Sequence, residues 1–455
     1  MLRSLKFTNF KSWEKADLPC GRITGLFGTN SSGKTSLIQF LLLLKQTKDA
    51  TDRALSIELN GGFVQLGTIN DAIHRHDDKK TIAWSLDFSL DKEMVLYDPS
   101  NEQKSIVVKG DHLQLSSEVL IAQKAPVATK IAYELGHMKF SLSLKPGSNS
   151  AFDLKASHID DTVSNFKFSR TTGRPWTLPG PIKSYAFPDQ ARTYYQNAGL
   201  IAELETAYEA ELDRVFYLGP LRDFPKRDYL WARSRPTDVG QRGEKAIDAI
   251  LAATAARETR NLRHKARNKA FQEIIAYWLH EMGLIESFTV GEIATGSNRW
   301  QAKVKTRQGA SEVLLTDVGF GISQVLPVVT LLQYVPEGST VILEQPEIHL
   351  HPLAQAALAD VIIQAALHRK IQVILESHSE HLLLRLQRRI AEEIISGDEV
   401  KLYFCDAPQG VSKLTPLEID LYGNITNWPA KFMGDAFGEA AEAEVARLKR
   451  MKAAR

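Results

Sequence analysis

The chain carries the stretch GTNSSGKT at residues 28–35, which fits the phosphate-binding pattern G-x-x-x-x-G-K-[ST]. Residues 23–27 before it form a short apolar run typical of a strand, and residues 36–44 (SLIQFLLLL) predict a buried helix. A strand, a glycine-containing loop and a helix in this order surround a phosphate group with backbone amides and the positive end of the helix. The stretch therefore predicts a nucleotide-binding loop.

The residue types in this loop suit ATP together with Mg²⁺. Gly28 and Gly33 let the backbone curve around a phosphate without side-chain clashes. Lys34 brings a positive charge to the β- and γ-phosphates, and the hydroxyl of Thr35 is a ligand for Mg²⁺. We expect the nucleotide contacts to come from Gly28, Asn30, Ser31, Ser32, Gly33, Lys34, Thr35 and Ser36.

Length and composition limit the remaining possibilities. The chain has 455 residues, enough for about two to four domains, and its apolar (44%) and charged (24%) contents are ordinary for a soluble protein. A net charge of +2 gives no global argument for binding nucleic acid. Cys20 and Cys405 are far apart, no apolar run reaches the ~20 residues of a membrane span, and the start lacks the core of a signal peptide. We expect a cytoplasmic protein without a membrane partner.

A second apolar run ends in a carboxylate residue, which is the type of ligand expected for Mg²⁺ bound to a nucleotide. Residues 341–343 (VIL) end in Glu344, which is the Walker B arrangement and predicts Glu344 as a metal ligand and catalytic residue. The usual motif is Asp followed by a catalytic Glu, but the position of that base holds Gln345, and an amide is a poor proton acceptor. Glu347 is the candidate replacement if the turn at Pro346 brings it back toward the nucleotide.

Two further stretches come after the Walker B run. Residues 348–352 (IHLHP) suit a D-loop, which lies at a dimer interface; a metal site at His349 and His351 and a plain structural loop are the alternatives. Residues 373–379 (VILESHS) form another buried strand that ends near His378. A histidine at a strand end beside a phosphate can contact the γ-phosphate or the attacking water, and a structural histidine is the alternative.

Two more candidates precede these motifs. Residues 317–324 (DVGFGISQ) come before an apolar helix, and glycines, a serine cap and a helix N-terminus form a second anion-binding surface, with Gly321 and Ser323 as nucleotide contacts. An ordinary helix cap is the alternative. Gln65, in the glycine-punctuated connection 61–70, suits a glutamine loop that contacts nucleotide and metal.

The chain is expected to be an α/β protein whose ATPase head is split by two insertions. Residues 1–80 hold the first part of the head, 81–190 a β-rich insertion, 191–285 a helical insertion, 286–405 the second part of the head, and 406–455 a C-terminal extension. Strand-like runs lie at 81–90, 104–108, 129–135 and 138–144, and helical spacing at 195–216, 244–283 and 437–453.

Basic residues gather in two places. A basic stretch at 257–269 suits phosphate contacts of DNA or RNA, and a solvated face or a protein–protein contact is the alternative. Its basic residues are Arg257, Arg260, Arg263, His264, Lys265, Arg267 and Lys269. Arg222, Lys226 and Arg227 surround the turn GPLRDFP, and Arg242 lies further along. One of these arginines could contact a nucleotide bound to a second copy of the chain. The alternative is that they form structural ion pairs.

The order of these motifs is that of ABC and SMC ATPases: P-loop, glutamine loop, signature, Walker B, D-loop and switch histidine. The stretches GTNSSGKTSLIQFLLLLKQT, DVGFGISQVLPVV, VILEQPEIHLHP and ESHSEHLLLRL resemble the ABC-type, AAA-like bacterial ATPases that include the overcoming-lysogenisation-defect (OLD) nucleases and the ATPase subunit of Septu-type anti-phage systems. Residues 420–432 (DLYGNITNWPAKF) also look like a C-terminal signature of this subgroup. The resemblance implies a P-loop fold of the ABC/SMC-head type that dimerises on ATP.

The chain departs from OLD-like nucleases in the segment after His378. A Toprim nuclease domain needs roughly a hundred residues with clustered acids, whereas residues 379–455 number 77 and carry only scattered ones. We therefore expect no complete Toprim domain. The Septu-type arrangement implies a separate HNH-type nuclease as partner of a homodimeric or larger regulatory ATPase. A RecF-like DNA-repair ATPase and a nucleotide-stabilised scaffold without useful hydrolysis stay open as alternatives.

Overall fold

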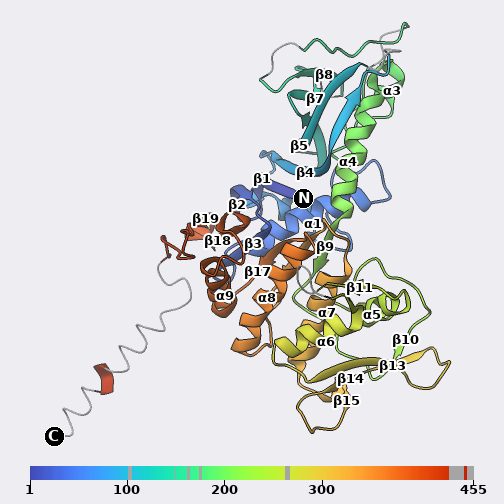
Figure 1. The fold of residues 1–455 in the computed structure, drawn as a ribbon. Helices are drawn as coiled ribbons and strands as arrows, with labels where there is room; N and C mark the ends of the chain where they lie inside the picture. The colour runs from blue at the N-terminus through green and yellow to red at the C-terminus, as the bar shows by residue number, and fades with distance from the viewer. Residues whose placement is uncertain are drawn as a thin grey trace.

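We describe a computed structural model of the chain, in which residues 1–100, 105–148, 150–160, 164–173, 177–261, 267–429 and 445–447 are defined. A parallel sheet forms the middle of the molecule, an antiparallel sheet with one long helix extends to one side, and a lobe of helices and short strands lies on the other (Figure 1). The candidate site belongs to the middle part.

The strands of the central sheet have the order β19-β18-β3-β17-β16-β9. Strand β19 is antiparallel to β18, and the other neighbours pair in parallel. Their bounds are Lys413–Leu417 (β19), Val400–Asp406 (β18), Ile23–Gly28 (β3), Gln372–Glu376 (β17), Thr340–Glu344 (β16) and Val215–Leu218 (β9). Every residue of β16 and β17 is buried, as expected for parallel strands covered on both faces.

Helices cover the two faces of this sheet. Alternating side chains of each strand point to opposite faces, so Ile342 and Ile374 pack with helix α1 while Val341 and Leu343 pack with α7 and α8. The helices span Lys34–Asp49 (α1), Phe320–Tyr334 (α7), Pro352–His368 (α8) and Glu380–Ala391 (α9). Because the strands are parallel, the ends of β3, β16 and β17 meet at one edge of the sheet, where ligands bind in open α/β folds.

The antiparallel sheet has the order β2-β1-β4-β5-β6-β7-β8. Its strands span Trp13–Pro19 (β2), Leu2–Phe10 (β1), Ile82–Tyr97 (β4), Ile106–Ala122 (β5), Ala125–Leu135 (β6), Met138–Leu144 (β7) and Phe152–His158 (β8). Buried and half-buried residues alternate at the start of β4, and helix α4 (Ile201–Asp213) packs on the apolar face. Strand β1 pairs with β4, so the β-rich insertion continues the N-terminal sheet.

A third region comes after β9. It contains helices α5 (Ala246–Ala255) and α6 (Phe271–Glu281), the hairpin of β11 (Thr259–Arg260) and β12 (Lys269–Ala270), and the strands β10 (Tyr229–Leu230), β13 (Ser287–Glu292), β14 (Arg299–Lys305) and β15 (Val313–Leu314). Its apolar side chains join the core on the α7 side of the central sheet. Short helices elsewhere are α2 (Ile69–Ala72) and α3 (Gln190–Tyr194).

The sequence predictions of the elements are confirmed in most places and wrong in three. The four strand-like runs lie in β4 to β7, and the P-loop strand and helix are β3 and α1. The helical pattern at 195–216 is wrong at its end, since β9 begins at Val215; that at 244–283 is interrupted by the β11–β12 hairpin. The serine cap before α7 is also wrong, because Gly319 is the N-cap. Three parts of the sequence predictions lie outside the described residues: most of the helical pattern at 437–453, residues 430–432 of the C-terminal signature, and Arg263, His264 and Lys265 of the basic stretch.

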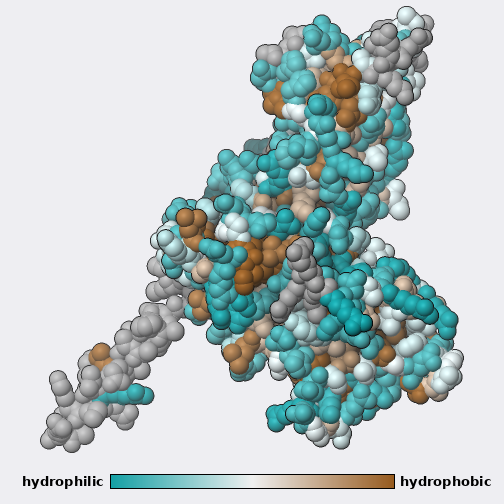
Figure 2. Space-filling view, in the orientation of Figure 1, coloured by the Kyte–Doolittle hydropathy of each residue, from teal (hydrophilic) through white to brown (hydrophobic). Residues whose placement is uncertain are grey.

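The surface differs between these regions. The face in Figure 2 is largely hydrophilic over the β13–β14 lobe, with a hydrophobic area at the middle of the molecule and another over the antiparallel sheet. Within the described ranges, no helix combines the length and the apolar character needed to cross a membrane.

Candidate nucleotide site

The P-loop has the backbone shape that its glycines were expected to permit. The φ angle is 136° at Gly28 and 93° at Gly33, a region that favours glycine. Close neighbours exclude any larger residue as well: a Cβ at Gly28 would lie 2.0 Å from the Cys405 carbonyl oxygen, and one at Gly33 would lie 2.3 Å from Ser412 Oγ. Strand β18 and the segment after it thus form the wall behind the loop.

Residues from both ends of the chain hold the loop in place. The indole Nε1 of Trp13 donates a hydrogen bond of 3.0 Å to the Gly33 carbonyl oxygen. Beside it, Ser412 Oγ bonds Ser12 Oγ at 2.6 Å, and the Ser412 amide donates to the Ser12 carbonyl at 2.8 Å. The loop therefore has a fixed support before any ligand binds.

Lys34 lies across the loop. Its ammonium group donates to the carbonyl oxygens of Gly28 (3.0 Å) and Thr29 (2.7 Å), and only 3% of the residue is exposed. Burial lowers the pKa of Lys34, and the charges of Glu376 and Cys405 oppose that effect. A phosphate in the loop would replace these carbonyls as the partner of the ammonium.

A carboxylate that the sequence prediction missed lies beside Thr35, the predicted Mg²⁺ ligand. Glu376, the last residue of β17, accepts a hydrogen bond of 2.9 Å from the Thr35 hydroxyl. Its register partner on the neighbouring strand is Glu344, the predicted Walker B acid. The signal was present in the sequence, because Glu376 ends a buried strand just before His378, but its closeness to Thr35 depends on β17 lying next to β3.

The two carboxylates influence each other. Burial and the charge of Glu376 raise the pKa of Glu344 to about 7, against a lowering by the hydrogen bond of 2.9 Å that Tyr217 donates to it. Burial also raises the pKa of Glu376, while Thr35 and Lys34 lower it. A cation at this position would favour the charged form of both groups.

These residues fit Mg²⁺ and a nucleotide phosphate. Hard carboxylate and hydroxyl oxygens are the ligands that Mg²⁺ prefers, and it usually takes only one or two carboxylates together with phosphate and water. The Ser32 hydroxyl is buried in the loop and has no hydrogen-bond partner in the described part of the chain. It is therefore free to donate a hydrogen bond to a phosphate oxygen. Thr35, Glu344 and Glu376 are the residues that would hold the metal.

Glu347 supports the turn that carries His378. Its Oε1 accepts hydrogen bonds of 2.8 Å from the Ser377 hydroxyl and from the His378 amide. The residue is 6% exposed, its Oε2 is buried without a hydrogen-bond partner among the described residues, and burial raises its pKa. His378 is exposed as a residue, yet partial desolvation of its imidazole ring, followed by the charge of Lys34, lowers the pKa of His378.

Gln345 and Arg222 complete this end of β16. Gln345 has a φ angle of 43°, and its amide donates to the Glu376 carbonyl at 2.8 Å. Arg222 is buried and donates to the carbonyl of Glu344 at 3.1 Å, so it braces the Walker B strand from within the same chain. Arg227 and Arg242 form ion pairs with Asp317 (3.2 Å) and Asp223 (2.9 Å).

The glutamine loop lies beside the Walker B acid. Gln65 is exposed, and the ring of Phe63, two residues earlier, packs edge-on against Tyr217, the partner of Glu344, with ring centres 6.4 Å apart. The amide of Gln46 bonds the backbone of this loop at Glu58, Phe63 and Val64. Phe63, in the loop that carries Gln65, therefore lies next to the hydrogen-bond partner of Glu344.

The signature stretch and the D-loop lie next to each other. A Cβ at Gly321 would lie 3.0 Å from the His349 carbonyl oxygen. Ser323 is buried, and its hydroxyl donates to the Phe320 carbonyl at 2.9 Å, so contact with a nucleotide requires this hydroxyl to turn outward. His351 is the N-cap of α8, and within the described ranges no group of three or more His, Cys, Asp or Glu side chains is placed to hold a metal ion.

Comparisons with known proteins give two family matches. Residues 193–385 match a family described as "AAA domain, putative AbiEii toxin, Type IV TA system", and residues 395–442 match a family of unknown function (DUF3696). The first match contains β16, β17 and the D-loop. A comparison with curated proteins gives no match.

Among solved structures, SMC head domains resemble the chain at low identity. An SMC head bound to the C-terminal winged-helix domain of ScpA has 11% identity and a TM-score of 0.46, with 92% of this chain and 98% of that chain covered. The SMC head domain of Thermotoga maritima has 10% identity and a TM-score of 0.40 over 92% and 99% of the two chains. A Pyrococcus furiosus SMC head with an extended coiled coil, bound to the C-terminal domain of ScpA, has 10% identity and a TM-score of 0.44 over 92% and 96%.

Similarity of this degree says nothing about what the chain binds. The sheet order, the P-loop between β3 and α1, and the carboxylates at the ends of β16 and β17 confirm the predicted α/β P-loop fold of the ABC/SMC-head type. Together with the match to an AAA domain, they support an ABC/SMC-like ATPase.

Proposed function

We propose that the chain is a Mg²⁺-dependent ATPase of slow turnover that dimerises on ATP and controls a separate nuclease in bacterial anti-phage defence. One observation carries the proposal. The P-loop has all the residues of a phosphate-binding site, but the neighbouring Walker B strand lacks the glutamate that usually acts as catalytic base. Gln345 comes directly after Glu344, and Glu347 already accepts two hydrogen bonds through Oε1. Such a site favours holding ATP over hydrolysing it.

The positions of the chain's own residues indicate their roles. The loop amides and Lys34 bind the phosphates, while Thr35, Glu344 and Glu376 hold the metal. When bound, Mg²⁺ would neutralise charge that develops on the transferred phosphoryl group. Glu347 orients the turn 377–378, so that the exposed His378 imidazole faces the γ-phosphate or the attacking water.

Exposed apolar residues around the signature support a homodimer. Leu221, Phe224, Phe320 and Leu353 are 75%, 71%, 58% and 74% exposed, and the rings of Phe224 and Phe320 touch with centres 5.8 Å apart. They belong to the GPLRDFP turn, the signature and the start of α8 after the D-loop. A second copy of the chain that contributes its P-loop here would cover them.

The defence role rests on the resemblance to OLD-type and Septu-type ATPases and on the AAA-domain match, whose description names a type IV toxin–antitoxin system. An HNH-type nuclease from a neighbouring gene is the proposed effector, with DNA or RNA as its substrate. The free thiols of Cys20 and Cys405 are compatible with the cytoplasm.

The test is co-purification of the neighbouring nuclease with wild-type and Lys34→Ala protein, with and without ATP. We expect the wild-type chain to bind the nuclease and to release or activate it in a nucleotide-dependent way, and Lys34→Ala to lose that dependence. ATP turnover at tens per second by the isolated chain would contradict slow hydrolysis. Tight, salt-dependent DNA binding by the isolated chain, with no effector bound, would favour the RecF-like alternative.

A further inference from the structure

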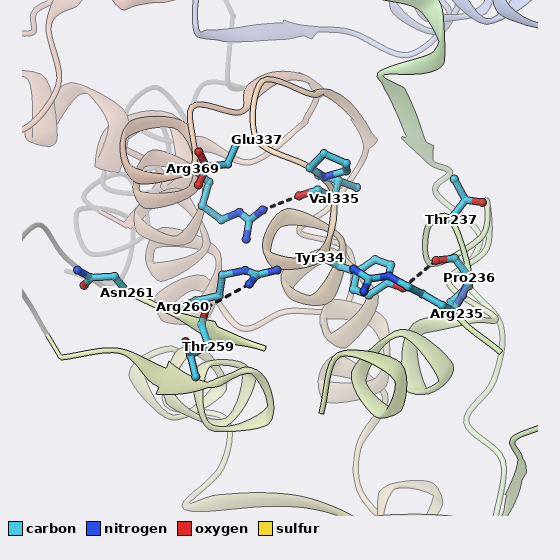
Figure 3. Close-up of a pocket in the computed structure, with 11 residues that line it drawn as sticks. Arg235, Pro236, Thr237, Thr259, Arg260, Asn261, Tyr334, Val335, Glu337 and Arg369 are labelled. Carbon is cyan, nitrogen blue, oxygen red and sulfur yellow. Dashed lines mark hydrogen bonds between the residues drawn. The ribbon is translucent and has the colours of Figure 1, made fainter. Parts of the chain in front are cut away.

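A pocket of about 650 Å³ lies at the far ends of the elements that carry the nucleotide motifs. Tyr334 ends α7, whose first turn is the signature; Glu337 precedes β16; and Arg369 is the C-cap of α8, which starts at the D-loop. The segments 235–237 and 259–261 complete the lining (Figure 3). The pocket therefore contains no P-loop residue and lies at the opposite ends of α7, β16 and α8 from the signature, Glu344 and the D-loop.

Three arginines from three separate segments line this pocket: Arg235, Arg260 and Arg369 (Figure 3). Arg369 is only 7% exposed and donates to the carbonyl oxygens of Gln333 and Val335, but its Nε is buried with no partner in the described part of the chain. The Nε of Arg260 is likewise buried and unpartnered within the described ranges. Two guanidinium groups thus have hydrogen-bonding capacity that the described protein does not use.

The acidic residues nearby do not balance these charges. Glu258 pairs with both Arg235 (2.7 Å) and Arg260 (2.5 Å), whereas Arg369 forms no ion pair among the described residues. Glu337 lines the pocket but is exposed and beyond ion-pair distance of Arg369. Burial, followed by the charge of Arg260, lowers the pKa of Arg369 to about 10, and an anion between the two guanidinium groups would relieve this repulsion.

We propose that this pocket binds the phosphate group of a small phosphorylated ligand, as a second anion site apart from the P-loop. Guanidinium groups match the oxygens of phosphate with paired hydrogen bonds, and three of them, from three separate segments, line this pocket. The hydroxyl groups of Thr237 and Thr259, which also line the pocket, supply further donors. The volume suits a ligand as large as a mononucleotide. This site goes beyond the proposed function and does not depend on it.

The test measures binding by calorimetry on Lys34→Ala protein, in which the P-loop is impaired. The probes are inorganic phosphate and AMP at low ionic strength. We expect one binding site that Arg235→Gln weakens about tenfold, the value of one charge-assisted hydrogen bond. Arg235 is 59% exposed by side chain, so this variant is expected to fold even if Arg369→Gln does not. Arg233→Gln, an exposed arginine outside the pocket lining, is the matched control and should bind as the parent does.

The two probes distinguish the source of the phosphate. Equal affinities assign the site to the phosphate ion itself, and tighter binding of AMP assigns it to a nucleotide. Absence of binding, or binding that Arg235→Gln and Arg260→Gln leave unchanged, overturns the proposal. Binding of a phosphorylated oligonucleotide without binding of phosphate or AMP would also overturn it and would point to a nucleic-acid surface.

Discussion

Gln345 occupies the position at which ATPases of this type usually have their catalytic base. Its amide is therefore the proposed reason why the protein binds ATP but hydrolyses it slowly. We expect Gln345→Glu to raise the rate of ATP hydrolysis by about 100-fold, because a positioned general base contributes roughly that much or more. Single-turnover hydrolysis with Mg²⁺ in excess measures this directly. Glu312→Gln changes an exposed glutamate between β14 and β15. It serves as the control and should leave the rate of hydrolysis unchanged.

Glu376 is the second residue whose role can be tested alone. Glu376→Gln removes the carboxylate that accepts the Thr35 hydrogen bond, and we expect Mg²⁺-dependent ATP binding to weaken about 10-fold to 100-fold. Nucleotide binding without Mg²⁺ should change much less, because Lys34 and the loop amides remain. Titrations of a fluorescent ATP analogue with Mg²⁺ and with EDTA provide the comparison. An equal loss in both conditions would contradict a metal-related role.

The motifs predicted the P-loop, Glu344 and the turn of His378 because each is encoded within a few consecutive residues. Glu376 was missed as a site residue, and the contacts of Arg222 with the end of β16 were not predicted, for a different reason. Their contacts with Thr35 and the end of β16 exist only when strands hundreds of residues apart become neighbours. Local sequence patterns describe neither strand order nor the direction in which a buried arginine points.

Gln372 joins several elements through one side chain. Its amide exchanges two hydrogen bonds with the backbone of Leu2 in β1 and donates to the Gly21 carbonyl, while Thr340 of β16 donates to it at 2.9 Å. Gln372→Leu keeps the volume but leaves these buried groups without partners, so we expect a loss of about 3 kcal/mol in the free energy of unfolding. Urea unfolding measures it, and Gln308→Leu in an exposed loop should change stability by less than about 0.5 kcal/mol.

Helix α4 carries a buried carboxylate that makes stability depend on pH. Burial raises the pKa of Glu205 from 4.5 to about 7, although it accepts hydrogen bonds from the Phe187 amide (2.7 Å) and Arg192 (2.8 Å). Because the folded pKa is raised, the contribution of Glu205 is fully present below about pH 4.5 and is lost as pH rises through 7.

The matching variant is Glu205→Gln, which cannot titrate. The stability of wild type relative to this variant should fall by about 3 kcal/mol between pH 4.5 and pH 8. Urea unfolding of both proteins at several pH values tests this. A difference between them that does not change with pH would show that Glu205 stays ionised in the folded chain.

Two of the three wrong predictions of elements have strand pairing as their cause. Residues 215–216 continue a helical pattern in sequence, yet residues 215–218 pair with Thr340–Leu343 and complete the edge of the parallel sheet. Residues 259–260 and 269–270 form a hairpin that interrupts a run of good helix formers. Pairing with a distant strand at 215–218, and pairing between two nearby segments at 259–270, outweighs a modest local preference for helix.

At the scale of the whole molecule, the apolar residues around the signature are expected to join two copies of the chain. Phe320→Asp should leave the monomer folded, because Phe320 is 58% exposed, but should abolish ATP-dependent dimerisation in light scattering. Ile106→Asp, at a similarly exposed apolar residue of β5 (59%), is the matched control and should dimerise as wild type does. Dimerisation of Phe320→Asp at wild-type ATP concentrations would exclude this face as the interface.

The support of the P-loop has a consequence for the synthesis of the protein. Residues 12–13 hold the loop from one side and residues 405–412 from the other, and β3 pairs with β17 and β18, which are synthesised several hundred residues after it. The strands of the antiparallel sheet all lie within the first ~160 residues and can pair early, whereas β3 must wait for β17 and β18. A nascent chain stalled before residue 400 would therefore present an unpaired apolar strand to chaperones and proteases, and would acquire its affinity for ATP only after residues 372–412 have been made.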